Sequence, residues 1–200
     1  MKKVLFVALA AAAMLLAGTQ VSAQVSFGFG PAARVFLANG ESLSLDNAVY
    51  GVQVGLEESS RVSDYFGYSA GVELSTFKKD AYFSTASGDA GLSEMYVDIP
   101  VRLKIYIPFS YDLQMFIFGG PVPSVCIGSH VLSGSSKESR FGENSNYSRF
   151  DVLAGGGIGL EAFEHLKVSL SYDHGLLDRD KNDNATLNSA LAKFTIAYMF

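Results

Sequence analysis

Leu166-Lys167-Val168-Ser169-Leu170-Ser171-Tyr172-Asp173 places an apolar side chain at every second position and a polar one between. Because successive side chains of a β-strand point to opposite faces, this stretch predicts a strand with one apolar and one polar face. The same period recurs in 25–37, 49–57, 66–77, 94–107, 112–127, 149–161 and 193–200. Segment 112–127 is the least regular, because Gly119, Gly120, Pro121 and Pro123 interrupt it. We expect a bulge or an edge-like distortion there and leave its register open.

The connections between these segments alternate in length. Long polar connections fall at 38–48, 78–93, 129–148 and 174–190, and shorter ones at 58–65, 108–111 and 162–165. Outer-membrane barrels join their strands by long outer loops and short periplasmic turns. A soluble lipocalin-like barrel would share the strand pattern but has no reason to keep this rhythm. The sequence therefore predicts an all-β fold, a closed antiparallel up-and-down transmembrane β-barrel of about eight strands.

The N-terminal residues 1–23 have the features of a secretory signal peptide. Lys2 and Lys3 precede an apolar run that ends at Ala17, and Val21 and Ala23 are suited to a cleavage site. A membrane anchor is the alternative, but the run is shorter than the roughly 20 apolar residues that a spanning helix needs. Cleavage after Ala23 would leave 24–200 as a single barrel domain in the bacterial outer membrane.

The composition limits the class of protein further. The chain has 15 Lys and Arg against 20 Asp and Glu, and removal of Lys2 and Lys3 would leave 13 against 20, a formal net charge of −7 instead of −5. This acidic balance argues against nucleic acid as a partner. The single cysteine, Cys126, cannot form an internal disulfide or serve as a lipid-anchored first residue. Hydrophobic residues make up 48% of the chain, yet no long apolar run follows residue 17, as expected for transmembrane strands.

The polar faces of the predicted strands supply the candidate site. A barrel of about eight strands has an interior that its own side chains can fill, and unpaired buried ions are costly. We therefore expect a structural network of salt bridges and hydrogen bonds, in preference to a conductance path or a catalytic carboxylate pair. Its predicted members are Arg34, Glu57, Glu73, Glu94, Asp98, Arg102, Lys104, Arg149, Asp151, Glu161, Lys167, Asp173 and Lys193.

Aromatic residues near the predicted strand ends suggest a girdle at the inner membrane interface, with ordinary core packing as the alternative. The residues assigned to this girdle are Tyr50, Phe66, Tyr106, Phe109, Tyr111, Phe163, Tyr198 and Phe200.

The stretch Tyr96-Val97-Asp98-Ile99-Pro100-Val101-Arg102-Leu103-Lys104 resembles the strand motif Y-x-D/E-I-P-L/V-x-L/V-K of the PorT-like outer-membrane β-barrel family of Bacteroidetes. Residues 149–175 are similar to the penultimate hairpin of that family. The resemblance covers most of 24–200, but only these two patches are specific, and the Pro-rich stretch 119–123 departs from the pattern. It implies a fold and a location and leaves the activity open. The end of the chain, with Tyr198 and Phe200, looks like the strand that the barrel-assembly machinery recognises.

Motifs for catalysis, cofactors and metals are weak. Ser171, Asp173 and His174 could supply a nucleophile, an acid and a base, but neighbouring positions on one strand rarely converge on a substrate. Residues 155–160 fail the dinucleotide fingerprint because Leu160 replaces its last glycine. The acidic loop 178–183 could hold a divalent cation, although a solvated loop explains it as well, and no Cys/His cluster has metal-ligand spacing. We expect no enzymatic activity, no cofactor and no bound metal.

The outer loops remain as the exposed part that could meet a partner, chiefly 129–148 and 174–190. The first hypothesis is a structural or binding protein of the outer membrane that contacts an extracellular or envelope protein through these loops. The second is a component of an envelope machine, such as a secretion or gliding apparatus, which the PorT resemblance allows. The third is a lipid-modifying enzyme. In each case outer-membrane lipid and, during biogenesis, the barrel-assembly machinery are expected partners.

Overall fold

A computed structural model describes residues 23–38, 47–85, 88–110, 112–133, 136–141, 147–180 and 186–200. All of the predicted signal peptide 1–23 except Ala23, and most of connection 38–48, lie outside these residues. The described strands are β1 (Ala23–Ala38), β2 (Ala48–Arg61), β3 (Phe66–Thr85), β4 (Gly88–Asp98), β5 (Val101–Ser110), β6 (Leu113–Ser133), β7 (Ser136–Ser139), β8 (Phe150–Ala162), β9 (Leu166–Gly175) and β10 (Leu187–Met199). A helix long and apolar enough to cross a membrane is not found in the described part of the chain.

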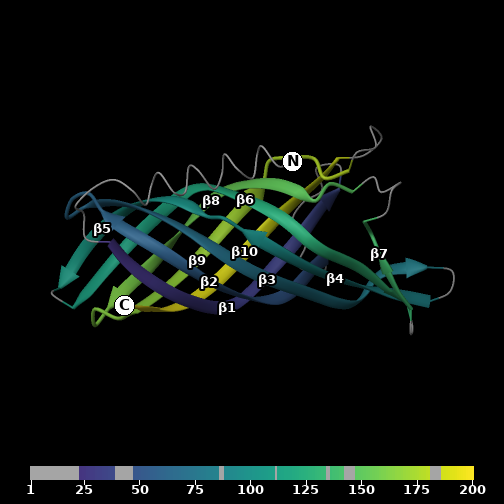
Figure 1. The fold of residues 1–200 in the computed structure, drawn as a ribbon, viewed down its shortest axis with the longest axis horizontal. Helices are drawn as coiled ribbons and strands as arrows, with labels where there is room; N and C mark the ends of the chain where they lie inside the picture. Colours follow the sequence, from purple (N-terminus) through teal and green to yellow (C-terminus); the bar gives the residue numbers. More distant parts are fainter. Residues whose placement is uncertain are drawn as a thin grey trace.

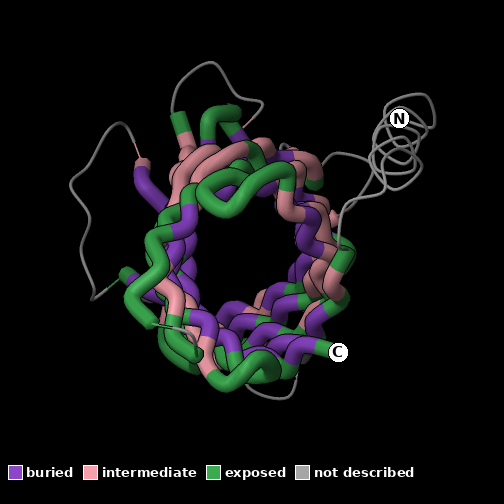
Figure 2. The backbone as a smooth tube through the Cα atoms, turned by 90° about the vertical axis from the view of Figure 1, so that its left-hand side faces the viewer, coloured by how far each residue is buried: buried purple, intermediate pink, exposed green. Residues whose placement is uncertain are grey.

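The strands close into one antiparallel ring (Figures 1 and 2). Neighbours in sequence pair around the wall, and β10 pairs with β1, with Met199 opposite Ser26. Because β4 and β5 share one place in the ring and β7 lies outside it, the ten strands of the described sheet make eight walls. The predicted all-β up-and-down barrel is thereby confirmed.

One predicted strand, 94–107, is interrupted in the structure. It divides into β4 and β5 at Ile99–Pro100, where the proline has no N–H to donate to a neighbour. Pairing continues around the break, because the N–H of Ile99 donates to the carbonyl of Pro123 at 2.8 Å. Gly120 lies against the same point, and a Cβ there would come within 2.1 Å of the Val101 carbonyl oxygen. The interruption is thus a kink in a continuous wall.

The predicted distortion of 112–127 lies at the end of that segment and not at its prolines. β6 pairs in unbroken register with β8 from Leu113 to Val125. Against β4, the register shifts between Met95 and Tyr96, which leaves Ile127 as an extra residue. The prolines are tolerated because the chain keeps an extended path through them, and the bulge turns β6 toward the outer end of the barrel.

The predicted loop 78–93 and the first part of the predicted loop 129–148 are wrong, because they form strands. β3 and β4 remain paired as far as Thr85 and Gly88, so connection 78–93 is a hairpin, and β6 continues to Ser133 and pairs with β7. The outer parts of β3, β4, β6 and β7 form a ribbon that extends past the ring at one end (Figure 1). The strict alternation of long and short connections therefore fails. We name this end the ribbon end; the opposite end, with turns 62–65 and 163–165, is the turn end.

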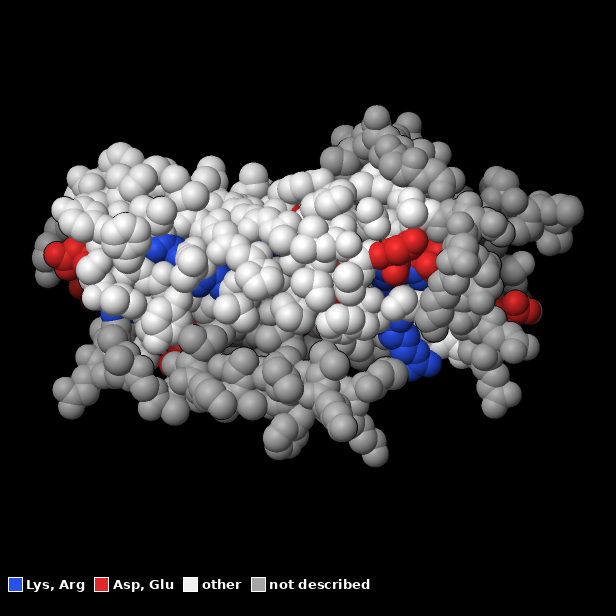
Figure 3. Space-filling view, turned by 90° about the horizontal axis from the view of Figure 1, so that it is seen from above, with Lys and Arg blue, Asp and Glu red and all other residues white. Residues whose placement is uncertain are grey.

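The polarity of the two faces reverses between the middle of the wall and the ribbon. Exposed outward residues in the middle are apolar, and they include Leu74, Ile105, Ile117, Ile158 and Leu170. In the ribbon, Lys78 and Asp80 form an exposed ion pair of 2.8 Å on the outside, and Phe77 and Leu92 are buried inside. Figure 3 shows the middle of one face with little charge, and the larger patches of acidic and basic side chains toward the two ends. This reversal marks the level at which the wall passes from an apolar surrounding into water.

Exposed aromatic residues gather at the turn end, as predicted for most of the girdle. Phe66, Phe109, Phe163, Tyr198 and Phe200 are all exposed. Two assignments are wrong: Tyr106 is buried on the inward face of β5, and Tyr50 is exposed near the start of β2, at the ribbon end. Tyr111 lies outside the described residues. Parity and strand direction, and not aromatic type, decide where each ring lies.

Candidate functional site

The inward side chains fill the barrel in three zones along its axis. The turn-end zone and the middle zone are polar, and the ribbon-end zone is largely apolar. Each zone is built by alternate residues of several walls, since only every second side chain of a strand points inward.

In the turn-end zone, the Glu57 carboxylate on β2 binds two lysines. Lys104 Nζ on β5 lies 2.6 Å from Glu57 Oε1, and Lys167 Nζ on β9 lies 2.8 Å from the same oxygen. Ser26 and Ser59 accept further hydrogen bonds from these ammonium groups, each at 2.8 Å. One carboxylate and two hydroxyl groups thus satisfy two buried cations, as a water-poor interior requires.

Arg61 closes this zone toward the turns. Its Nη2 lies 2.7 Å from Glu161 Oε2, and its guanidinium lies 4.3 Å from the centre of the Tyr106 ring. The prediction omitted Arg61 because it precedes the turn at 62–65, where alternation no longer indicates the direction of a side chain.

In the middle zone, Arg102 is the central cation. Its Nη2 lies 2.7 Å from both carboxylate oxygens of Asp173, and its Nη1 donates to the carbonyl oxygens of Gly120 and Gly155 at 2.7 and 3.2 Å. Both charged side chains are almost fully buried. A glycine is required at 155, because a Cβ there would come within 2.1 Å of the Tyr172 carbonyl oxygen. Arg102 therefore links its own strand β5 to three other walls of the barrel, β6, β8 and β9.

The other middle-zone charges also have partners on other walls of the barrel. Lys193 pairs with Glu73, and Asp151 accepts a hydrogen bond from Ser189 at 2.8 Å. Asp98 accepts hydrogen bonds from the hydroxyl groups of Ser75 and Ser124.

Arg34 is held by a ring more than by hydrogen bonds. Its Nη2 is 3.7 Å from Asp98 Oδ1, and its guanidinium lies 3.6 Å from the centre of the Tyr96 ring, with Phe77 at 5.4 Å. The side chain is fully buried, and its nitrogens have no hydrogen-bond partner among the described residues. Ion pairing and cation–π attraction together offset part of the cost of burying this charge.

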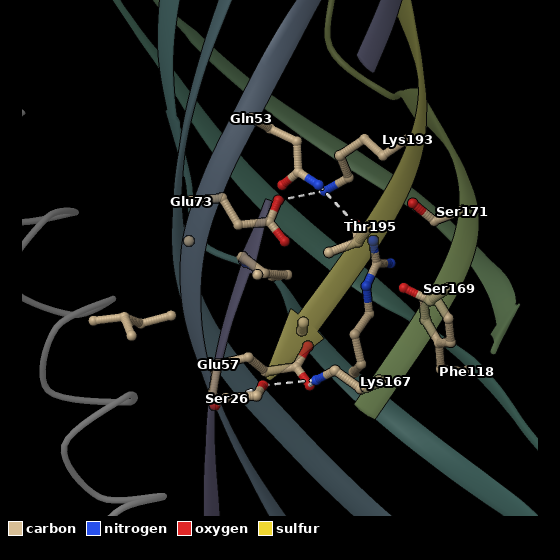
Figure 4. A pocket seen from close by; sticks show the side chains of 16 residues that line it. Ser26, Gln53, Glu57, Glu73, Phe118, Lys167, Ser169, Ser171, Lys193 and Thr195 are labelled. Atoms are coloured by element: carbon tan, nitrogen blue, oxygen red, sulfur yellow. Dashed lines mark hydrogen bonds and ion pairs between the residues drawn. The ribbon is translucent and has the colours of Figure 1, made fainter. Parts of the chain in front are cut away.

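A small cavity separates the Glu57 and Glu73 ion pairs (Figure 4). Its volume is about 50 Å³, enough for a few water molecules. Gln53 and Thr195 line it and share a hydrogen bond of 2.7 Å, and Ser169 and Ser171 face it from β9. The polar half of the interior is therefore filled by side chains with room for bridging water.

In the ribbon-end zone, Glu94 sits within an apolar cluster. The predicted polar lumen is wrong here: the buried members of the cluster are Ala32, Phe36, Val49, Phe77, Leu92, Tyr96, Val122, Cys126, Leu153 and Leu191. Glu94 accepts hydrogen bonds from the hydroxyl groups of Tyr96 (2.6 Å), Ser129 (2.8 Å) and Tyr147 (3.3 Å). Burial, and after it the Glu94 carboxylate, raises the pKa of Tyr147 above its usual range, so this hydroxyl remains a donor. Inward side chains are no longer polar here, because the outward face is exposed to solvent and the inward face forms the hydrophobic core.

Arg179 is the residue that sequence reasoning missed most clearly. It lies in the loop predicted to be solvated or to bind a cation, yet it is fully buried against the ribbon-end zone. Its Nη1 donates to the Tyr96 hydroxyl at 2.8 Å, and its guanidinium lies 4.4 Å from the centre of the Tyr147 ring. A loop has no period that would indicate the direction of this side chain.

The predicted network members other than Arg149 all lie in the interior. Arg149 is exposed at the ribbon end, with its guanidinium 4.2 Å from the centre of the Phe141 ring. It precedes Phe150, the first residue of β8, so the alternation of that strand does not extend to it.

Ser171, Asp173 and His174 do not converge. Ser171 and Asp173 point inward, where Arg102 holds Asp173, and His174 lies on the opposite face of β9. In the described part of the chain, no group of three acidic, His or Cys side chains could hold a metal ion. At the end of β10, Tyr198 stacks on His165 with centroids 5.3 Å apart, and the N–H of Phe200 donates to the Val25 carbonyl at 2.9 Å.

A filled interior predicts the absence of a steady pore. We expect planar bilayers that contain the folded protein to show no large, stable single-channel conductance, because paired side chains and the apolar zone occupy the axis. A wide porin recorded in the same bilayers is the positive control. Large and steady unitary currents would contradict a structural role for the interior.

The comparisons with known proteins agree with this architecture. The model of the outer membrane protein beta-barrel domain matches residues 17–180. The structure of Ail, the attachment invasion locus protein of Yersinia pestis, is similar at a TM-score of 0.54 and 14% identity, over 88% of this chain and 98% of that chain. Neisserial surface protein A (TM-score 0.48, 12% identity, 89% and 97% covered) and the outer membrane enzyme PagL (0.45, 12%, 85% and 97%) are further matches. No curated protein sequence matches the chain. This chain belongs to the outer membrane protein beta-barrel domain family and is a protein of the bacterial outer membrane.

Proposed function

We propose that this chain is a non-catalytic binding protein of the outer membrane, whose ribbon and outer loops contact an extracellular or envelope protein. One observation carries the proposal: the strands extend as a ribbon beyond a barrel whose interior is filled. A filled barrel offers little to transport, whereas a paired ribbon presents a fixed surface to water. Its exposed side chains include Lys78, Asp80, Lys137 and Glu138, which suit the polar rim of a contact with a protein.

The ribbon is suited to recognition because its strands are paired. Hydrogen-bonded pairing with the barrel continues through β4 and β6, and Leu92 and Phe77 anchor its base in the ribbon-end zone. A preordered surface loses less conformational entropy when a partner binds than a flexible loop does. The ribbon therefore favours binding more than the loops predicted from sequence would.

Two other functions remain as alternatives. The PorT-like motif in Tyr96–Lys104 supports a component of a secretion or gliding machine, although its Tyr96, Asp98, Arg102 and Lys104 side chains serve interior contacts. A lipid-modifying enzyme would need a nucleophile and a base in reach of each other, and His174 faces away from Ser171.

A pull-down from native outer membrane in mild detergent tests the proposal. The matched variant replaces residues 80–91 by Asn-Gly, which joins the paired residues Lys79 and Leu92 through a two-residue hairpin turn. We expect the wild-type protein to retain a stoichiometric surface or envelope protein and the shortened variant to lose at least 10-fold of it. Heat-modifiable gel mobility shows whether the variant still forms a barrel.

Other outcomes separate the alternatives. Equal capture by the wild-type protein and the shortened variant would show that the contact does not involve the ribbon and would contradict the proposal. Secretion or gliding proteins that co-purify with both would favour the envelope machine. An altered lipid profile on expression would favour the enzyme. Ail has been solved with the heparin analogue sucrose octasulfate, so this compound is a useful soluble competitor in the pull-down.

A further inference from the structure

We propose that Arg179 is a latch that fastens the outer segments 147–148 and 176–180 to the inner wall and so keeps the ribbon-end zone closed to water. As a positioning residue it would also fix the surface that a partner meets, and only that second role rests on the proposed function.

Arg179 reaches inward from a segment that follows β9. Its side chain is fully buried, and its guanidinium lies among three rings, at 4.4 Å from the centre of Tyr147, 5.2 Å from that of Tyr96 and 5.8 Å from that of Phe36. These rings come from β1, from β4 and from the segment before β8. The side chain therefore ties an outer segment to two walls and to a second outer segment.

The charge of Arg179 is balanced through a relay. Arg179 donates to the Tyr96 hydroxyl at 2.8 Å, and that hydroxyl donates to Glu94 Oε2 at 2.6 Å. Glu94 is itself buried and accepts from Ser129 and Tyr147. Burial of an arginine without such a relay would be strongly unfavourable, so the relay makes the inward position stable.

Backbone bonds connect the same segments. The N–H of Ser148 donates to the Arg179 carbonyl at 2.8 Å, the N–H of Arg179 donates to the Leu187 carbonyl at 2.9 Å, and Tyr147 bridges Asp180. Arg179 also donates from Nη2 to the Ser148 carbonyl at 3.3 Å. Release of the side chain would thus free a connected set of segments at the outer mouth and not one residue.

The single cysteine of the chain can report whether water reaches the ribbon-end zone. This residue, Cys126, is fully buried in the apolar cluster and pairs with Tyr96 across β4 and β6. A closed latch predicts that a membrane-impermeant thiol reagent, applied to the folded protein in outer membranes, reacts with Cys126 very slowly.

The test compares Arg179→Ala with the wild-type protein in this labelling assay. We expect the variant to label at least 10-fold faster, because loss of the guanidinium opens the space between Tyr96 and Tyr147. Tyr96→Phe, which keeps the ring and removes the hydroxyl that links Arg179 to Glu94, is expected to label at least threefold faster. Lys137→Ala, which removes an exposed cation from β7 at the same end, is expected to match the wild-type rate.

Only variants that form folded barrels by heat-modifiable gel mobility are compared. If Arg179→Ala does not fold, the labelling rate of Tyr96→Phe tests the proposal. The latch is contradicted if the folded variants label at the wild-type rate, or if Lys137→Ala accelerates labelling equally. The pull-down above separates the two proposals. If Arg179→Ala labels faster but the wild-type protein captures no partner, the latch is supported and the binding function is contradicted. If the wild-type protein captures a partner but labelling of the folded variants is unchanged, the binding function is supported and the latch is contradicted.

Discussion

Replacement of Arg102 by Leu is expected to cost the barrel about 3–5 kcal/mol of folding free energy. The substitution would leave the Asp173 carboxylate fully buried without the cation that now lies 2.7 Å from both of its oxygens. It would also remove the donors to the Gly120 and Gly155 carbonyls. Urea titration of the protein in lipid vesicles, followed by gel mobility, measures the loss.

Two controls make the origin of this loss clear. Arg102→Leu combined with Asp173→Leu removes both charges and is expected to recover a large part of the lost stability, since the buried unpaired ion is gone. Lys78→Leu breaks an exposed pair in the ribbon and is expected to change stability by less than about 1 kcal/mol. Equal effects at Arg102 and Lys78 would show that the interior is as wet as the surface and would refute the filled-lumen account.

The period of the polar residues was sufficient to predict the polar half of the interior. Arg102 and Lys104 on β5, and Lys167 and Asp173 on β9, all point inward because each is an even number of positions from the next on its strand. Which carboxylate each cation meets was not predictable, because the partner depends on the register between strands that are distant in sequence. Glu57, for example, joins β2 to both Lys104 and Lys167.

The ribbon end was harder to predict for a physical reason. In the ribbon the outward face is polar and the inward face is apolar. A pattern that assumes polar inward residues along the whole strand therefore predicts a loop where the ribbon lies. Phe77 and Leu92 carry the signal for this reversal, since they continue the inward parity of Ser75 and Glu94 but with apolar side chains. Arg179 and Arg149 lie outside the strands, where no period exists, and only the structure places one inside and the other outside.

Replacement of Leu170 by Arg tests the claim on which the orientation of every strand depends. Leu170 is 57% exposed in the middle of β9, in a row with Ile158 and Phe194 on the outside of the wall. If this face contacts acyl chains, a charge there is expected to cost about 2–4 kcal/mol near the bilayer midplane. The same titration in vesicles measures the loss.

Glu138→Arg, on the exposed strand β7, introduces the same side chain on the water side of the polarity reversal and is expected to change stability by less than about 0.5 kcal/mol. If Leu170 contacts lipid, the two substitutions will change stability by different amounts. If both positions contact water, the two changes in stability will be similar. An unchanged stability of Leu170→Arg, together with a protein that stays monomeric without detergent, would mean that the apolar face does not contact lipid. The strand pairing itself would then be wrong, because the closed ring places this face outside, and the 32 large hydrophobic residues that are exposed in the described part of the chain would not be expected on a stable soluble monomer.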